Sequence, residues 1–308
     1  MADYILHQYD SSPFAYKARL YFGFKQLAWR AVAIPMVMPK PLLMPLTGGY
    51  RRTPVMQIGA DIYFDTALIA AELERRHPDP TFYPAGGEAM AQIFTAWSDQ
   101  NMFLPAANFS LSLVADKLPQ EFFEDRAKMM NRPVTPIEKM KAATPLFKSQ
   151  LCLQLDRLAN LLADGRRFLL GEKPGLADIA VVHPLWMAAK NSGKRSAAAF
   201  DPYPVVREWI DRVDALGQGT RGELDAKEAL AIAKAATPET PRASEEFEGA
   251  PKLGARVSVQ TEDRTPEPVV GEVVMVRRNE VAIRRTDPEA GEIVVHVPRA
   301  GFMIRPAA

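Results

Sequence analysis

The chain has 308 residues, of which 47% are hydrophobic and 24% charged, and its 38 basic and 37 acidic side chains leave a net charge of +1. Single cores stop growing near about 250 residues, so this length predicts two or three domains. The composition excludes a disordered or fibrous chain, and the balanced charge provides no overall field to attract nucleic acid or an anionic membrane.

The only cysteine, Cys152, excludes a disulfide within the chain and favours a reducing compartment. The N-terminal segment carries Asp3 and an apolar run that is too short for a secretion signal. No stretch approaches the roughly 18 uncharged apolar residues that a membrane-spanning helix requires. We therefore expect a cytoplasmic protein with no membrane partner.

The first 80 residues alternate between strand and helix signals. Ser12 is a suitable N-cap, and Pro13 stands where a helix tolerates proline best, at its first position. Period-two and period-three-to-four apolar patterns identify the other elements. In chain order we expect a strand at 3–9, a helix from 13, a strand at 29–34, a proline-rich loop at 35–45, strands at 53–58 and 62–64, and a helix from 65 to 77.

The rest of the chain divides into a helical part and a β part. Residues 88–236 have a helical pattern, strongest at 88–104, 136–163, 178–190 and 204–216, and no strand is expected among them. Residues 237–252 combine prolines with acidic residues and predict an exposed linker. From 253 to 308 the apolar period is two, which predicts a small β-sheet or barrel with strands at 256–259, 272–276, 280–284 and 293–297. The predicted fold class is α+β.

Three segments of the first 80 residues resemble the N-terminal domain of the cytosolic glutathione transferases. Ser12-Pro13-Phe14 is similar to the Ser-Pro-Phe and Cys-Pro-Phe of the tau and omega classes. Thr53-Pro54-Val55-Met56 resembles the family segment whose proline is cis, and Phe64-Asp65-Thr66-Ala67-Leu68-Ile69 stands where the family has Glu-Ser-x-Ala-Ile. The resemblance implies a thioredoxin-like, glutathione-binding domain over residues 1–80.

A fourth segment, Gly175-Leu176-Ala177-Asp178-Ile179-Ala180, is similar to the capping box of the family's helical domain. Gly175 replaces the usual hydroxyl residue, so only half of the reciprocal hydrogen bonding is available. The resemblance covers about residues 1–236 and implies an all-α transferase domain over 88–236. The β module has no counterpart in the usual family.

Ser12 is the candidate catalytic residue. Glutathione reacts as its thiolate, and because the ordinary pKa of a thiol is about 8.5, the site must favour the charged form. A hydroxyl that donates to the sulfur does this, and so does the positive end of the helix. However, Ser-Pro is also typical of an ordinary capped helix, and Ser11 is an alternative donor. Serine favours conjugation over disulfide exchange, because only cysteine forms a mixed disulfide.

The predicted glutathione-binding residues are Phe14, Arg52, Thr53, Pro54, Asp65 and Thr66. Arg51 and Arg52 flank the site in sequence and could pair with the glycine carboxylate of glutathione. A cis bond before Pro54 would present the Thr53 backbone to the cysteinyl part of glutathione, in the manner of a strand. Asp65 would receive the γ-glutamyl ammonium, and the helix start at Thr66 its carboxylate. A plain edge proline, a simple helix cap and a solvated Arg52 are the alternatives to these roles.

Other features suggest little further chemistry. Phe14 and Phe109 are candidates for a pocket that holds the electrophile, although most aromatic side chains are expected in the core. The four histidines lack paired ligand spacing, so we expect no metal. The arginines of the β module are balanced by acidic residues, so we expect no nucleic-acid partner.

Two functions remain open. The first is conjugation of glutathione, as co-substrate, to a small hydrophobic electrophile that the sequence does not identify. The second is a non-catalytic glutathione-transferase-like module for dimerisation or protein interaction, in which the fold is kept without the chemistry. The resemblance also implies a homodimer in which the helix around Trp97 packs against its mate.

Overall fold

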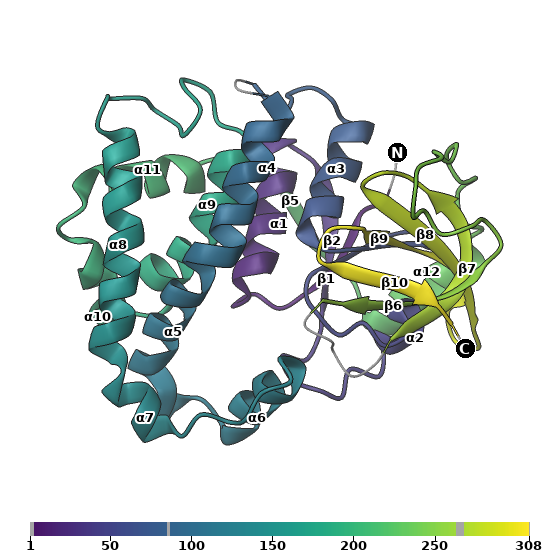
Figure 1. The fold of residues 1–308 in the computed structure, drawn as a ribbon, viewed down its shortest axis with the longest axis horizontal. Coiled ribbons are helices and arrows are strands. Elements are labelled where there is room, and N and C mark those ends of the chain that lie inside the picture. Colours follow the sequence, from purple (N-terminus) through teal and green to yellow (C-terminus); the bar gives the residue numbers. More distant parts are fainter. Residues whose placement is uncertain (1–2, 85–86, 263–267, 308) are drawn as a thin grey trace.

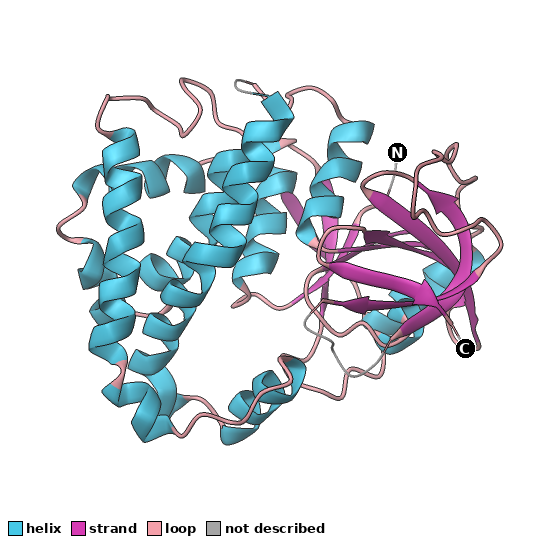
Figure 2. Cartoon of the chain, viewed as in Figure 1, coloured by secondary structure: helices cyan, strands magenta, loops and turns pink. Residues whose placement is uncertain are grey.

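The computed structural model describes residues 3–84, 87–262 and 268–307. Residues 1–2, 263–267 and 308, which belong to the predicted first domain and β module, lie outside the described residues. Helices form one half of the molecule, and most strands lie in the other half (Figure 2). The strands are β1 (Ile5–Gln8), β2 (Ala28–Ala33), β3 (Val55–Ile58), β4 (Asp61–Phe64), β5 (Thr220–Glu223), β6 (Arg256–Thr261), β7 (Val269–Val276), β8 (Glu280–Asp287), β9 (Gly291–Pro298) and β10 (Phe302–Pro306).

The helices follow the predicted pattern, with additional short turns between them (Figure 1). Two segments, η1 and η3, are π-helical, and η2 and η4 are 3₁₀ turns. The helical elements are α1 (Pro13–Phe24), α2 (Met44–Thr47), α3 (Thr66–Arg76), α4 (Gly87–Trp97), η1 (Ser98–Met102), α5 (Phe103–Val114), η2 (Ala115–Lys117), α6 (Gln120–Met129), α7 (Ile137–Ala142), α8 (Thr144–Leu162), α9 (Leu176–Trp186), η3 (Met187–Asn191), α10 (Lys194–Ala197), η4 (Ala198–Phe200), α11 (Pro204–Asp214) and α12 (Ala226–Ala235).

The thioredoxin-like arrangement predicted for the first 80 residues is confirmed. β1 pairs with β2 in parallel and with β3 antiparallel, and β3 forms a hairpin with β4. α1 begins at Pro13, as predicted, and the Ala15 N–H donates to the Ser12 hydroxyl at 3.1 Å. The proline-rich loop contains the single-turn helix α2, which was not predicted.

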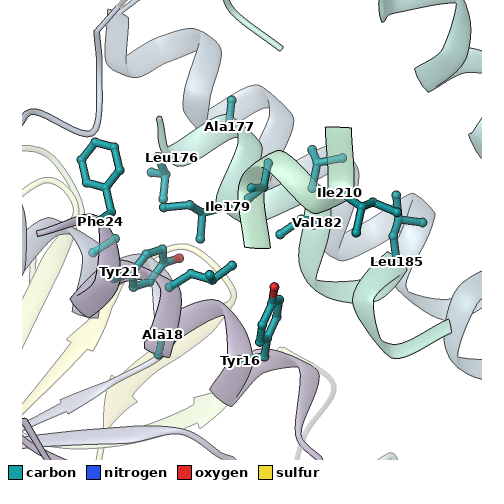
Figure 3. Packing of buried hydrophobic residues seen from close by; sticks show 14 of the residues in the cluster. Tyr16, Ala18, Tyr21, Phe24, Leu176, Ala177, Ile179, Val182, Leu185 and Ile210 are labelled. Atoms are coloured by element: carbon teal, nitrogen blue, oxygen red, sulfur yellow. The ribbon is translucent and has the colours of Figure 1, made fainter. Parts of the chain in front are cut away.

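The helical half packs on the sheet through α1 and α9 (Figure 3). The ring of Tyr16 on α1 stacks on that of Trp186 at 4.2 Å. α9 begins with half of the expected capping box, because the Asp178 carboxylate accepts the Gly175 N–H at 3.0 Å. A Cβ atom on Gly175 would lie 2.7 Å from the Phe82 carbonyl oxygen, so this close approach explains the glycine.

We expected no strand over residues 88–236, and this expectation is wrong. β5 lies within this range and pairs in parallel with β2. No sequence signal marks this strand, because its four residues are exposed and lack the alternating apolar pattern. Gly219 precedes it with φ of 71°, and a Cβ atom there would lie 2.4 Å from the Leu27 carbonyl oxygen. Only glycine permits this approach between the end of the helical half and β2.

The predicted C-terminal strands are present, and they continue the thioredoxin-like sheet. The sheet has the strand order β10-β6-β7-β8-β9-β4-β3-β1-β2-β5. β9 pairs in parallel with β4, so Tyr63 lies opposite His296. The sequence pattern predicted a module behind a linker, and strand patterns carry no signal for a pairing between such distant segments.

The two faces of the sheet have separate hydrophobic cores. Alternate residues of β1 show the division: Leu6 packs with α1 and the helical half, and Ile5 packs on the opposite face. α2 is only four residues long, and α12 and the C-terminal strands supply most of the cover on that second face. The second core joins residues of the first 64 positions with Leu230, Val273, Ile283, Val295 and Phe302.

The segment 237–252, predicted as a linker, contains no helix or strand but is attached to its neighbours. Glu239 forms an ion pair with Arg76, and its N–H donates to Asp61 at 2.8 Å. Farther along, the Glu245 N–H donates to the Val276 carbonyl at 2.8 Å, and the Val276 N–H donates to the Ser244 hydroxyl. The predicted domain boundaries and the exposure of this segment to proteases stay predictions.

A cluster of buried charges lies where β9 meets β4. The His296 ring nitrogens lie 3.0 Å from an Asp61 carboxylate oxygen and 2.7 Å from one of Glu280, and the ring stacks on Tyr63. Arg242 forms an ion pair with Glu280. Burial lowers the pKa of His296, but the two carboxylates outweigh it and hold the pKa above its ordinary value. His296 therefore connects the N-terminal and C-terminal strands, and its two carboxylate partners favour the imidazolium form.

We predict that this cluster makes stability depend on pH. Because the folded-state pKa of His296 is raised, its contribution is complete below the unfolded value of about 6.5 and is lost as pH rises through the folded value. His296→Gln should remove this dependence and lower the free energy of unfolding by about 3 to 5 kcal/mol, because it removes the cation that lies between two buried carboxylates. Urea unfolding of both proteins from pH 5.5 to 9 measures the effect, and parallel pH profiles would contradict it.

Candidate functional site

The predicted site residues gather at one end of the thioredoxin-like sheet. The register aligns His7 with Val55 and Val55 with Phe64 across β1, β3 and β4. The segment after β1, the segment before β3 and the segment after β4 therefore meet at the same end. These segments carry Ser12, Thr53-Pro54 and Asp65-Thr66.

Ser12 is buried at the N-terminus of α1, whereas Ser11 is exposed. The Ser12 oxygen accepts the Ala15 N–H, and the Ser11 hydroxyl donates to the Met36 sulfur at 3.4 Å. A hydroxyl has one donor proton and two acceptor lone pairs, so Ser12 can cap the helix and still donate to a ligand. Ser12, and not Ser11, therefore occupies the N-terminus of α1.

Thr53, Pro54, Asp65 and Thr66 border the same region. The Thr53–Pro54 peptide bond is cis, as the resemblance implied. Asp65 caps α3 by accepting the Ala67 N–H at 2.9 Å, and its φ of 67° is unusual for a residue other than glycine. Such conformations cost about 1 to 3 kcal/mol and cluster at binding and catalytic sites. Burial, followed by the nearby charge of Asp99, raises the pKa of Asp65, while Lys17 and Arg52 partly oppose this.

Lys40 borders the same region and was not identified from the sequence. Its side chain is buried, with 3% of its surface exposed, and Nζ donates to the Arg51 carbonyl at 2.9 Å and to the Thr53 hydroxyl at 3.3 Å. Burial, together with the charges of Arg126 and Arg51, lowers the pKa of Lys40 to about 8. Both hydrogen-bond acceptors are neutral, so the ammonium is buried without a directly bonded carboxylate.

Two other buried lysines show how unusual this environment is. Lys17 is bonded to Asp99 at 3.0 Å, and Lys25 is bonded to Glu74. A lysine side chain can be buried in its charged form when it is paired and hydrogen-bonded. Without a partner, burial favours its neutral form. Within the described residues, Lys40 thus has the environment of a binding group for an anion that the chain itself does not supply.

The remaining predicted residues have different surroundings. Arg51, which flanks the site in sequence, forms a buried ion pair with Asp125 of α6. The partly buried Phe14 ring lies 4.8 Å from that of Phe103 and 4.7 Å from that of His183, between the two halves of the molecule. Phe109 is buried in the helical core and exposes little surface to an acceptor.

A sequence signal for Lys40 did exist. It is the only charged residue between positions 33 and 46, in a loop of prolines and apolar residues. A charged residue that is enclosed by apolar neighbours in this way is a candidate for a buried functional group. No comparable signal identified Asp125 and Arg126, because α6 has an ordinary mixture of charged and apolar residues.

Comparison with known proteins agrees with this geometry. Residues 6–81 match the glutathione S-transferase N-terminal domain, and residues 153–212 match the glutathione S-transferase C-terminal domain. A GST-like protein from Pseudomonas syringae has a similar crystal structure at 39% sequence identity, with a TM-score of 0.79 and full coverage of both chains. The chain belongs to the glutathione S-transferase family. The similarity of this glutathione S-transferase-like chain to the Pseudomonas syringae protein extends through the C-terminal strands.

More distant structures share the fold. A glutathione S-transferase from Rhodospirillum rubrum F11 is 21% identical, with a TM-score of 0.52 over 69% of this chain and 88% of its own. FzlA from C. crescentus is 18% identical, with a TM-score of 0.53 over 80% of this chain and 94% of its own. None of the curated protein sequences compared with the chain matches it.

The described residues contain no helix of sufficient length and apolar character to cross a membrane. They also contain no group of three or more His, Cys, Asp or Glu side chains placed to hold a metal ion.

Proposed function

We propose that this glutathione S-transferase-like protein binds glutathione at the end of the sheet and conjugates it to a small hydrophobic electrophile. Buried Lys40, with its unbalanced charge beside Thr53, carries the binding proposal. The helix termini at Ser12 and Asp65 support it, because each directs backbone N–H groups toward the same region. The lone Cys152 is consistent with a reducing cytoplasm, where glutathione remains a thiol.

The charges of the site favour one direction for the proposed glutathione. Its γ-glutamyl group is assigned to Asp65 and Thr66, where a carboxylate and a helix N-terminus match an ammonium and a carboxylate. Its cysteine is assigned to Thr53 and Ser12, and its glycyl carboxylate to Lys40. The resulting order places the sulfur beside the α1 terminus and the two charged ends on either side.

Ser12 acts on the sulfur in this proposal. The thiol releases its proton to solvent, and the hydroxyl and the α1 terminus stabilise the thiolate that remains. The thiolate sulfur then forms a bond to the electrophilic carbon, and the electron pair of the broken bond leaves with the departing group. The partly buried ring of Phe14, two residues after Ser12 in sequence, is assigned to the apolar side of the acceptor.

We predict that Lys40→Met weakens glutathione binding about 10- to 100-fold, because a hydrogen bond to a charged group contributes about 1.5 to 3 kcal/mol. The parent should also lose affinity for S-methylglutathione as pH rises through about 8, where Lys40 loses its proton, and Lys40→Met should not. Calorimetric titration between pH 6.5 and 9 measures both effects. Equal affinities in parent and variant would refute the assignment.

We predict that Ser12→Ala raises the pKa of bound glutathione and lowers turnover about 10- to 100-fold while binding is largely retained. Loss of the cap alone would lower stability by about 1 kcal/mol and leave turnover unchanged. Ultraviolet titration of the bound thiolate distinguishes the two roles.

Ser11→Ala is the matched comparison, because it removes the neighbouring exposed hydroxyl. It should leave the thiolate titration unchanged. Superimposable curves for Ser12→Ala and the parent would remove Ser12 from the chemistry. Glutathione binding by a parent protein that fails to turn over a panel of electrophiles would favour the non-catalytic alternative.

We predict a homodimer in which the α4–α5 surface of one copy contacts the other. Ile93 is 60% exposed and Leu104 44% exposed, and Met90 adds a third exposed apolar side chain on this surface. Ile93→Glu should therefore convert a dimer into the 34.2 kDa monomer in sedimentation. Leu253→Glu, at an equally exposed residue elsewhere, should not; a parent that sediments only as a monomer would refute the prediction.

A further inference from the structure

α6 is a helix of the helical half that forms hydrogen bonds to the thioredoxin-like half. Only Phe123 and Ala127 of this helix are buried hydrophobic residues. In Figure 1 it lies at the lower edge of the molecule, between the helical half and the loops beside β1. Its adjacent residues Asp125 and Arg126 form hydrogen bonds and an ion pair with the thioredoxin-like half.

Asp125 fixes the position of α6. It accepts the Met38 N–H at 3.0 Å and forms an ion pair with Arg51, and the two paired side chains are 8% and 5% exposed. Burial opposes ionisation of Asp125, but Met38 and Arg51 outweigh it and hold the pKa below its ordinary value. A buried, charged contact of this kind fixes the backbone of the loop that carries Lys40.

Arg126 extends from this fixed position toward the candidate site. Its guanidinium donates to the Tyr9 hydroxyl at 3.1 Å and to the Met36 carbonyl at 3.0 Å. Tyr9 also lies near Lys40, whose Nζ is 5.9 Å from the centre of its ring. Arg126 is the charge that most depresses the pKa of Lys40, after burial itself. Two cations thus lie close to Tyr9, one at its hydroxyl and one near its ring.

The local charge balance calls for an anion. Lys40, Arg51 and Arg126 are cationic, and Asp125 is bonded to both arginines and to the Met38 N–H. Like charges held together in a partly buried region repel each other unless a ligand neutralises them. A carboxylate between Lys40 and Arg126 would supply the missing charge with hydrogen bonds from both sides.

We propose that Arg126 is a specificity-determining residue that binds the glycyl carboxylate of glutathione together with Lys40. This inference rests on the proposed glutathione binding and adds a contribution from the helical half. The pocket for the carboxylate is complete only when α6 is in contact with the Lys40 loop. A thiol ligand without a charged C-terminus therefore loses an interaction that both halves of the molecule provide.

The test compares two ligands across three proteins. Glutathione and its glycyl monoethyl ester, which lacks the terminal negative charge, are titrated calorimetrically into the parent, Arg126→Gln and Lys128→Gln in about 50 mM salt. Lys128 is an exposed cation on the same helix, so its replacement controls for the net charge of α6. Arg126→Gln should weaken glutathione binding about 10-fold and leave ester binding within about twofold. Lys128→Gln should change neither.

A structural role for Arg126 gives a different result. Equal weakening of both ligands by Arg126→Gln, or no weakening of either, would overturn the inference while leaving the proposed glutathione binding intact. Failure of the parent to bind glutathione would instead overturn the proposed function and this inference with it. If Arg126→Gln unfolds, Arg126→Lys serves in its place: a retained preference for glutathione over the ester supports the charge role, and its loss in a folded variant refutes it.

Discussion

A sheet that is apolar on both faces must be covered on both faces, and the rest of this structure follows from that requirement. The helical half and α1 cover one face. The opposite face has only the single turn of α2 from its own part of the chain, and α12 with the C-terminal strands completes the cover. Burial of apolar surface is the main stabilising term in folding, and the C-terminal strands share this second core with strands β1 to β4. The parallel pairing of β9 with β4 also satisfies backbone groups that β4 would leave exposed as an edge strand.

Local signals were sufficient to predict the parts of the fold that form from neighbouring residues. Ser12 and Pro13 marked the start of α1, and the alternating residues of β3 and β4 marked their hairpin. Pairing of β4 with β9 brings together Asp61 and His296, which are 235 positions apart, and strand patterns do not specify such a partner. The exposed strand β5 had no apolar pattern to reveal it.

The same distinction applies to the candidate site. Ser12, Thr53, Asp65 and their neighbours stood out because they form short continuous segments that resemble a known family. Lys40 required knowledge of burial, because a lysine in a loop is usually solvated. Arg126 required knowledge of the fold, because its relation to Lys40 exists only after α6 has crossed to the other half of the molecule. At the junction of β4 and β9, the charge of His296 is balanced by the carboxylates of Asp61 and Glu280. Lys40 has only neutral hydrogen-bond acceptors, and there a ligand is expected to supply the negative charge.

The pairing of β4 with β9 also determines the order in which the chain can fold during synthesis. Strands β1 to β4 leave the ribosome first, but the strand that covers their edge and the residues that complete their second core come from the last part of the chain. At about 5 to 20 residues per second, the interval between them is on the order of tens of seconds. Throughout that time the nascent chain presents an unpaired edge and an apolar face, the two features that most favour aggregation. The cover of strands β1 to β4 is therefore complete only when strands β6 to β10 have been made.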